Sequence, residues 1–128
     1  MGYRSEAVLA VAKEEYERIV ATGNEDIIDA LHEWSDRVYE RDSVIVIKWG
    51  WIKWYSDYTS IAAVESWFDE MDDMANVQSN LEDREVEAKY QFVRAGEENG
   101  DVESRGSIWF GLEVHTQISL PGKLEEDL

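Results

Sequence analysis

The chain has 128 residues, contains no cysteine and carries a formal charge of −17 from 29 acidic and 12 basic residues. A chain of this length is expected to form one domain with a core of its own. The lack of cysteine excludes disulfide bonds, thiol catalysis and thiolate metal sites, and it is typical of a reducing compartment. The charge disfavours contact with nucleic acid or anionic membranes and favours a basic protein as the partner.

Nothing in the sequence predicts export or membrane insertion. No apolar run approaches the roughly 20 residues that a membrane-spanning helix needs, and the N-terminal residues lack the apolar core of a signal peptide. We therefore expect a cytoplasmic protein, in the cytoplasm of the host cell if the gene is viral. Residues 1–120 are expected to form the single domain, and the acidic tail 121–128 is expected to fray.

Two helices are predicted at the N-terminal end of the chain. Apolar residues within 5–21 recur near one stripe at helical spacing, which predicts a first helix that ends before Gly23. Asn24 is a typical N-cap for a second helix that runs to about Glu40. The short junction suggests that the two helices fold back on each other. The buried stripe of the second helix is predicted to contain Ile27, Leu31, Trp34 and Val38.

Residues 43–55 form the most apolar and aromatic segment and are predicted to be a long strand at the centre of a sheet. Side chains of both parities are apolar, which is expected where a strand is covered on both faces. Gly50 is expected to mark a bend or a β-bulge. The alternative is a hairpin that turns at Trp49 and Gly50, which we disfavour because tryptophan is a poor turn residue.

A third, acidic helix is predicted next. Thr59 or Ser60 can cap it, and its regular apolar stripe extends to about Ala75, where an irregular polar link begins. The apolar side of this helix is predicted to consist of Ile61, Val64, Trp67, Phe68, Met71 and Ala75.

Two strands with alternating apolar residues, within 86–92 and 108–120, are predicted to form a C-terminal hairpin. A three-residue loop that ends at a left-handed Gly100, with Glu97 opposite Asp101, brings the large apolar residues of both strands to one face. The order helix, helix, strand, helix, strand, strand (ααβαββ) predicts an α+β fold with a mainly antiparallel sheet. The helical start, the long bent strand and the final hairpin are loosely similar to cone-shaped α+β cavity folds.

The six tryptophans divide into two groups. Trp49 and Trp109 are the candidates for a partly open pocket or for an anchor in a protein interface, where tryptophan is enriched. The other four lie on or near apolar stripes and are predicted to be core residues: Trp34, Trp51, Trp54 and Trp67.

The sequence contains none of the nucleophile, phosphate-binding or dinucleotide-binding motifs that would predict an enzyme. The motif Glu70-x-x-Asp73 resembles the second half of the paired acidic motif of helical nucleotide pyrophosphohydrolases, which hold magnesium, but no first half with the required spacing and helical context is present. His32 and His115 are the only histidines and lie far apart in the sequence, which does not favour a transition-metal site. We therefore predict no catalytic residue, no metal site and no cofactor.

Many acidic residues gather in groups along the third helix, the link that follows it and the hairpin tip. Carboxylates on one helix face recur about every 6 Å, whereas duplex DNA carries one charge per about 1.7 Å. One helix face is therefore too sparse to imitate DNA, and an imitation requires the groups to lie on one side of the molecule. The alternative is that these groups are solvated faces spread around the domain. The predicted partner-binding residues are Glu65, Asp69, Glu70, Asp72, Asp73, Glu82, Asp83, Glu85, Glu97, Glu98, Asp101 and Trp109.

Converging carboxylates would bind Lys and Arg side chains in the groove of a nucleic-acid-binding protein and block access by competition. We therefore predict a non-enzymatic acidic inhibitor that acts as a DNA or RNA mimic, similar in strategy to small phage-type anti-CRISPR or anti-restriction proteins. The alternative is a small-ligand-binding or catalytic α+β cavity protein, which requires a sizeable pocket containing Trp49 or His115. A third interpretation, a salt-adapted housekeeping domain, requires evenly spread acidic residues. An exposed Trp49 or Trp109 would also allow a dimer.

Overall fold

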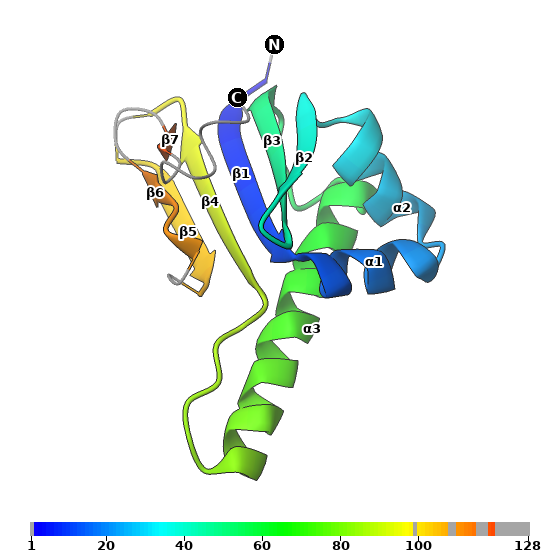
Figure 1. Ribbon diagram of the computed structural model, residues 1–128. Coiled ribbons are helices and arrows are strands. Elements are labelled where there is room, and N and C mark those ends of the chain that lie inside the picture. Colours follow the sequence, from blue (N-terminus) through cyan, green and yellow to red (C-terminus); the bar gives the residue numbers. More distant parts are fainter. Residues whose placement is uncertain (1, 99, 108–109, 115–117, 120–128) are drawn as a thin grey trace.

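The computed structural model describes residues 2–98, 100–107, 110–114 and 118–119. The fold is α+β, with an antiparallel five-stranded sheet that carries helices on one face (Figure 1). In chain order the elements are β1 (Ser5–Ala12), α1 (Lys13–Ala21), α2 (Glu25–Ile28), the π-helical turn η1 (Asp29–Glu33), β2 (Arg37–Arg41), β3 (Val44–Ile52), α3 (Thr59–Glu82), β4 (Tyr90–Gly96), β5 (Val102–Gly106), β6 (Glu113–Val114) and β7 (Ile118–Ser119).

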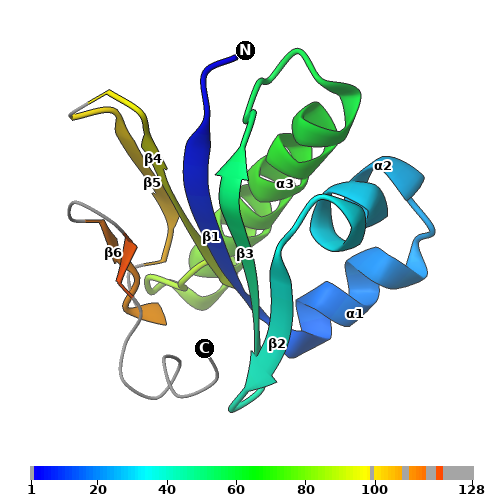
Figure 2. The ribbon, with the colours of Figure 1, turned by 90° about the horizontal axis from the view of Figure 1, so that it is seen from above.

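The strand order is β2-β3-β1-β4-β5, so β1 lies at the centre of the sheet (Figure 2). The predicted order ααβαββ is wrong at its start, because residues 5–12 of the predicted first helix form β1 and only its remainder is helical, as α1. The reason lies in residues 7–11, which are apolar without interruption and fully buried. Such an apolar run is compatible with a buried helix segment and equally with a strand that is covered on both faces. Residues 5–12 form a strand because they pair with β3 on one side and β4 on the other.

The predicted strand at residues 43–55 is confirmed as β3, beside the central strand instead of at the centre. Ile45, Ile47 and Trp49 face the helices, and Val44 and Val46 lie in the cluster on the opposite face, so both faces are covered as expected. The register to β1 shifts by one residue between Trp49 and Ile52. This irregularity is the β-bulge expected at Gly50, and it brings Ile52 to the same side as Trp49.

The predicted second helix begins correctly but is too long. The Asn24 side chain accepts a hydrogen bond from the backbone N–H of Ile27 at 3.2 Å, as an N-cap should. The helical segment ends at η1, and β2 follows it as an edge strand. Asp42 and Ser43 both have positive φ (53° and 64°) and join β2 to β3 in a two-residue hairpin turn. Positive φ at both central residues is the mark of a type I′ turn, which selects a hairpin over a helix here.

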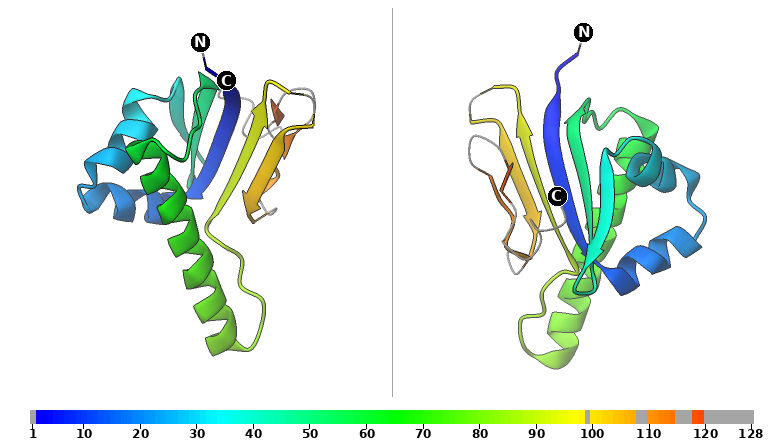
Figure 3. Two further views of the ribbon diagram at one scale, coloured as in Figure 1. Left: turned by 180° about the vertical axis from the view of Figure 1, so that it is seen from behind. Right: turned by 45° about the horizontal axis from the view of Figure 1, so that its top comes forward.

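α3 begins at Thr59, one or two residues earlier than predicted, because the N-cap is Tyr58 and not Thr59 or Ser60, and it ends at Glu82 instead of about Ala75. Its predicted apolar stripe is buried from Ile61 to Met71, against the sheet. No glycine or proline interrupts residues 76–82, and the left-handed Asp83 (φ 50°) forms the C-cap. The C-terminal half of the helix therefore continues past the sheet (Figure 3).

The C-terminal hairpin exists, but its strands are not the predicted ones. β4 pairs with β5 in a register that sets Phe92 opposite Arg105, one residue away from the predicted alignment. Gly100 is left-handed as predicted (φ +88°). The loop is one residue longer than the predicted three-residue loop, because the last pair of the hairpin is Gly96 and Asp101, where the N–H of Gly96 donates to the carbonyl of Asp101. The predicted register assumed that β4 has one apolar face and pairs only within the hairpin. In the structure β4 is buried on both faces and also pairs with β1, so the alternation of apolar and polar residues did not determine its register.

The predicted strand 108–120 is wrong as a partner of β4. The pairing of β5 ends at Gly106, and β6 and β7 form a separate two-stranded sheet. The chain crosses to the face of the sheet away from the helices, where Phe110 and Leu112 are buried against Val8 and Ala10 of β1. Residues 108, 109, 115–117 and 120, and the predicted tail 121–128, lie outside the described residues.

The main core lies between the sheet and the helices and is largely aromatic. Trp49 stacks edge-on against Trp54, with ring centroids 5.2 Å apart, and Trp54 lies 4.8 Å from Phe92. Phe68 of α3 contacts Phe92 and Tyr90, each at 4.9 Å. Aromatic pairs at such distances add stabilisation beyond the area they bury, so this chain of rings fixes α3 on the sheet.

Gly106 is the residue at which β5 turns away, and we predict that it tolerates no side chain. Its φ is +81°, and an added Cβ would overlap the carbonyl oxygen of Tyr90. Gly106→Ala should lower the free energy of unfolding by about 3 kcal/mol, from the left-handed backbone and the clash together. Gly100→Ala is the matched control, with φ +88° and open space, and should cost only about 1–2 kcal/mol. Urea unfolding of the two variants measures the difference, and equal losses would contradict the prediction.

Candidate functional site

The C-terminal half of α3 and the segment that returns from it to the sheet form a projection (Figures 1 and 3). We call α3 residues 73–82 together with residues 83–89 the distal arm. Most of its side chains are exposed, whereas the preceding half of α3 is packed on the sheet. The distal arm is therefore the part of the predicted acidic region that is most accessible to a partner.

The N-terminal half of α3 is anchored by a buried carboxylate. Glu15 of α1 accepts hydrogen bonds from the Trp67 indole N–H at 2.9 Å and from the Arg18 guanidinium at 2.7 and 2.9 Å. Burial alone would raise the pKa of Glu15, but the bonds from Arg18 and Trp67 outweigh it and hold this pKa below its usual value. Arg18 also pairs with Glu70 of α3. Glu70 thus helps to hold α1 and α3 together.

Arg105 of β5 neutralises two more of the predicted partner-binding carboxylates. Its guanidinium lies 2.8 Å from Asp69 and 3.1 Å from Asp72, above the ring of Phe68. Asp72 also accepts a hydrogen bond from the Tyr90 hydroxyl at 3.0 Å. Of the five predicted carboxylates on α3 up to position 73, three are therefore engaged inside the protein, which leaves Glu65 and Asp73 without an ion pair among the described residues.

The distal arm retains most of its negative charge. Asp83, Glu85 and Glu87 are exposed and, like Asp73, form no ion pair within the described part of the chain. Its two basic residues are already used: Arg84 pairs with Glu82, and Lys89 pairs with Glu14 of α1 at 2.7 Å. The arm is thus a surface of uncompensated carboxylates.

The hairpin-tip carboxylates serve the tip itself. Asp101 accepts hydrogen bonds from the Tyr3 hydroxyl at 2.6 Å and from Arg94 at 3.1 Å, and these bonds lower its pKa. Glu97 accepts a hydrogen bond from the backbone N–H of Arg4, and the backbone N–H of Glu98 donates to the Tyr3 hydroxyl. The side chains of Glu97 and Asp101 therefore hold the N-terminal segment to the hairpin tip. Of the three carboxylates, that of Glu98 is exposed and makes no such contact within the described residues.

The structure brings the α3 and link groups together but keeps the tip apart. The link precedes β4 and the tip follows it, and seven strand residues separate their ends by about 20 Å. A full imitation of duplex DNA requires all the acidic groups on one side of the molecule. The structure brings together only those of α3 and the link, and the hairpin tip does not join them. Trp109 lies outside the described residues.

The predictions for the other tryptophans are partly wrong. Trp54 and Trp67 are buried as expected, but Trp34 and Trp51 are exposed. Trp49 is fully buried, with its indole N–H donating to the carbonyl of Ala30 at 2.9 Å, so it lines no open pocket of the kind that the cavity hypothesis required. The bulge reverses the parity after Trp49, which is why Trp51 points outward. His115, the other residue of that hypothesis, lies outside the described residues.

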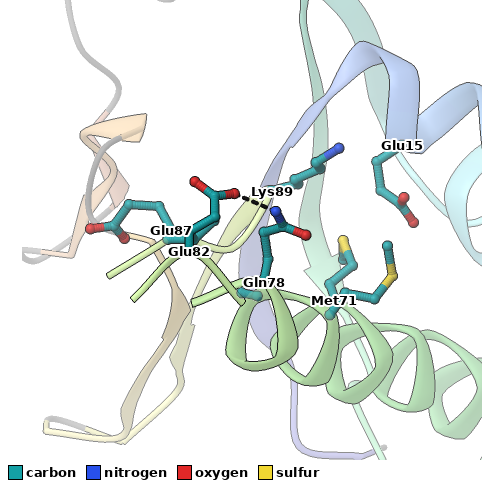
Figure 4. Close-up of a pocket in the computed structure, with 9 residues that line it drawn as sticks. Glu15, Met71, Gln78, Glu82, Glu87 and Lys89 are labelled. Atoms are coloured by element: carbon teal, nitrogen blue, oxygen red, sulfur yellow. Dashed lines mark hydrogen bonds between the residues drawn. The ribbon is translucent and has the colours of Figure 1, made fainter. Parts of the chain in front are cut away.

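An apolar stripe on the distal arm was not predicted. Met74, Val77 and Leu81 are 43%, 58% and 76% exposed, and their spacing of three and four residues aligns them on one face of α3. The helical periodicity continued past Ala75 in the sequence and was the available signal. Beside this stripe, the helix and the returning segment enclose a cavity of about 240 Å³ (Figure 4). The cavity is lined by Glu15, Met71, Met74, Ala75, Gln78, Glu82, Val86, Glu87 and Lys89.

No protein-family model matches this chain, and no significant match was found among curated proteins or solved structures. Within the described residues, no helix combines the length and apolar character needed to cross a membrane. In the same part of the chain, no group of three or more histidine, aspartate or glutamate side chains is placed to hold a metal ion. The motif Glu70-x-x-Asp73 in particular has Glu70 engaged by Arg18.

We predict that Glu15 makes folding sensitive to acid. Its folded-state pKa is lowered, so its stabilisation is present above its unfolded pKa of about 4.3 and is lost as the pH falls towards the folded value. Glu15→Gln should reduce the free energy of unfolding at neutral pH by about 2–3 kcal/mol. The variant should also lose less further stability than the unmodified protein between about pH 6 and pH 3.

The control is Glu17→Gln, because Glu17 is exposed on the same helix and should differ from the unmodified protein by no more than about 0.5 kcal/mol. Chemical denaturation at several pH values provides the measurement. A Glu15→Gln protein with unchanged neutral stability, or with the original acid dependence, would show that the buried carboxylate does not act in this way.

Proposed function

We propose that this protein is a non-enzymatic acidic inhibitor that binds the basic groove of a nucleic-acid-binding protein and blocks it, as a nucleic-acid mimic of the anti-CRISPR or anti-restriction type. The observation that carries the proposal is the distal arm, where uncompensated carboxylates are gathered on a projecting element. The strategy needs no catalytic group or cofactor, and the partner is a basic protein instead of nucleic acid itself.

The charge density of the arm supports the imitation of one strand. Asp73 and Glu82 are nine residues apart on α3, which corresponds to about 14 Å along the helix axis. Because Glu82 pairs with Arg84, the four carboxylates of the arm that remain unpaired provide roughly one charge per 3.5 Å over this length, close to the spacing of about 3.4 Å along a single DNA strand. Duplex DNA carries twice that density, so the arm would occupy the part of a groove that binds one phosphate backbone.

The mechanism is competition by charge. Lys and Arg side chains that normally bind phosphates would form ion pairs with the carboxylates of the arm and release their counterions, as they do for nucleic acid. Long-range attraction between a chain of net charge −17 and a basic groove would also speed association, most strongly at low salt.

The test uses two matched triple variants that remove the same amount of charge. Asp73→Asn/Asp83→Asn/Glu85→Gln neutralises unpaired carboxylates of the arm, whereas Glu17→Gln/Glu25→Gln/Glu33→Gln neutralises exposed carboxylates of the α1–η1 region. Each immobilised protein captures partners from a lysate of the host-type cell in which it would act, and mass spectrometry identifies them. Captures at about 0.1 M and about 0.5 M salt, with and without added DNA, show whether binding is electrostatic and competitive.

We expect capture of a nucleic-acid-binding protein that added DNA and high salt displace. Each exposed ion pair contributes up to about 1 kcal/mol, so the arm variant should weaken capture by about tenfold to a hundredfold. The control triple should weaken it by less than about threefold, because only long-range attraction is reduced. Failure to capture such a protein, or equal losses in both triples, would refute the proposed function.

A further inference from the structure

The exposed apolar stripe of the distal arm is the feature that the imitation of phosphates leaves unused. Met74, Val77 and Leu81 lie on one face of α3, and their exposure increases towards the helix end. Within the described residues, no apolar side chain of the main core is packed over this face, since the core cluster on α3 ends at Met71. Exposed apolar rows with a polar rim mark interaction surfaces in soluble proteins.

A cavity adjoins the stripe and shares Met74 with it. Its apolar wall consists of Met71, Met74, Ala75 and Val86. Figure 4 shows Gln78 and Glu82 joined by a hydrogen bond at one side, with Glu15 and Lys89 at the other. A volume of about 240 Å³ lies below the roughly 300 Å³ of the smallest typical ligand pockets. The cavity is therefore suited to one large side chain of a partner.

The charges around the stripe select the occupant. Asp73 lies beside it on the helix, and the exposed carboxylates of Asp83 and Glu85, which form no ion pair within the described residues, follow its last residue, Leu81, in the sequence. A contact between two copies of the arm would bring the unpaired carboxylates of both copies together, in chains that each carry a net charge of −17, and like charges would repel. A second copy of this acidic chain is thus disfavoured, and a partner with basic flanks is favoured.

We infer that the distal arm docks a basic amphipathic helix of the target protein, with the helix's apolar row on Met74, Val77 and Leu81 and one large apolar side chain in the adjoining cavity. Lys and Arg residues beside that row pair with Asp73, Asp83 and Glu85, which form no ion pair within the described part of the chain. This inference deepens the proposed function and rests on it for the identity of the target. The contact is the helix-in-groove mode, in which anchors recur at helical spacing.

The apolar contact also gives the arm selectivity that charge alone lacks. Carboxylates exposed to water attract any basic surface, and salt screens this attraction. An anchor in a cavity discriminates by shape, because a target without a matching apolar residue leaves the cavity empty. The arm therefore distinguishes its target from other basic proteins of the cell.

The test uses a defined probe. A synthetic peptide of about 18 residues carries leucines at helical spacing on one face and lysines on both flanks. A second peptide has the same composition, with the leucines scattered around the helix. Titration of each peptide into the full chain at about 0.15 M salt, followed by calorimetry, gives the two affinities. We expect the amphipathic peptide to bind at least about tenfold more tightly than the scattered one.

The decisive variant is Val77→Asp/Leu81→Asp, which adds two negative charges to an exposed surface. If attraction were electrostatic only, this variant would bind the lysine-rich peptide more tightly; if the stripe is the contact, it should lose about tenfold or more. Val38→Asp/Val102→Asp adds the same charge at exposed positions of the two edge strands and should bind as the unmodified chain does or slightly more tightly. Circular dichroism confirms that each variant is folded.

Three results would overturn the inference: equal affinity for the two peptides, tighter binding by Val77→Asp/Leu81→Asp, or a dimer in sedimentation that this variant dissociates.

The outcome is separable from that of the proposed function. A chain that captures a DNA-displaced protein equally well with and without the two aspartates has the proposed function but not this docking site. A chain that discriminates between the peptides but captures no nucleic-acid-binding protein has the docking site but not the proposed function.

Discussion

The burial of β1 on both faces is the constraint on which the structure depends. Ala7, Leu9 and Val11 face the helices, and Val8 and Ala10 face the opposite side, so the strand is stable only if both faces are covered. The aromatic residues of β3, β4 and α3 provide one cover. The second is provided by the chain after β5, which the Gln91 side chain ties to the sheet through two hydrogen bonds with the backbone of Leu112.

The covering of β1 also determines where negative charge remains free. Near the sheet, Arg18 and Arg105 hold α1 and β5 to α3 and in doing so neutralise Glu70, Asp69 and Asp72. Beyond the sheet, no arginine of another element pairs with α3 within the described residues, and Asp73, Asp83, Glu85 and Glu87 of the distal arm keep their charge. One helix therefore has two functions, because its first half is an element of the core and its second half is a surface.

This division bears on the high net charge of the chain. Uncompensated carboxylates repel one another and disfavour the compact state. Grouping several of them on a projection increases their distance from the charges near the sheet. The exposed Met74, Val77 and Leu81 lie within this group, and this combination of an apolar row with a charged rim is the feature on which the proposed docking site rests.

Local chemistry alone determined several features of this protein: the β3 strand with two apolar faces and a bulge at Gly50, the Asn24 cap, the apolar stripe of α3, and the left-handed Gly100. These depend on residues close in sequence, which is why periodicity and turn chemistry predicted them. Whether residues 5–12 form a helix or a strand, the register of β4 and the neutralisation of Asp69, Glu70 and Asp72 depend on partners far along the chain. Only the tertiary structure decided them, because a short apolar run suits either element until it has a neighbour, and a carboxylate is free or paired according to what folds against it.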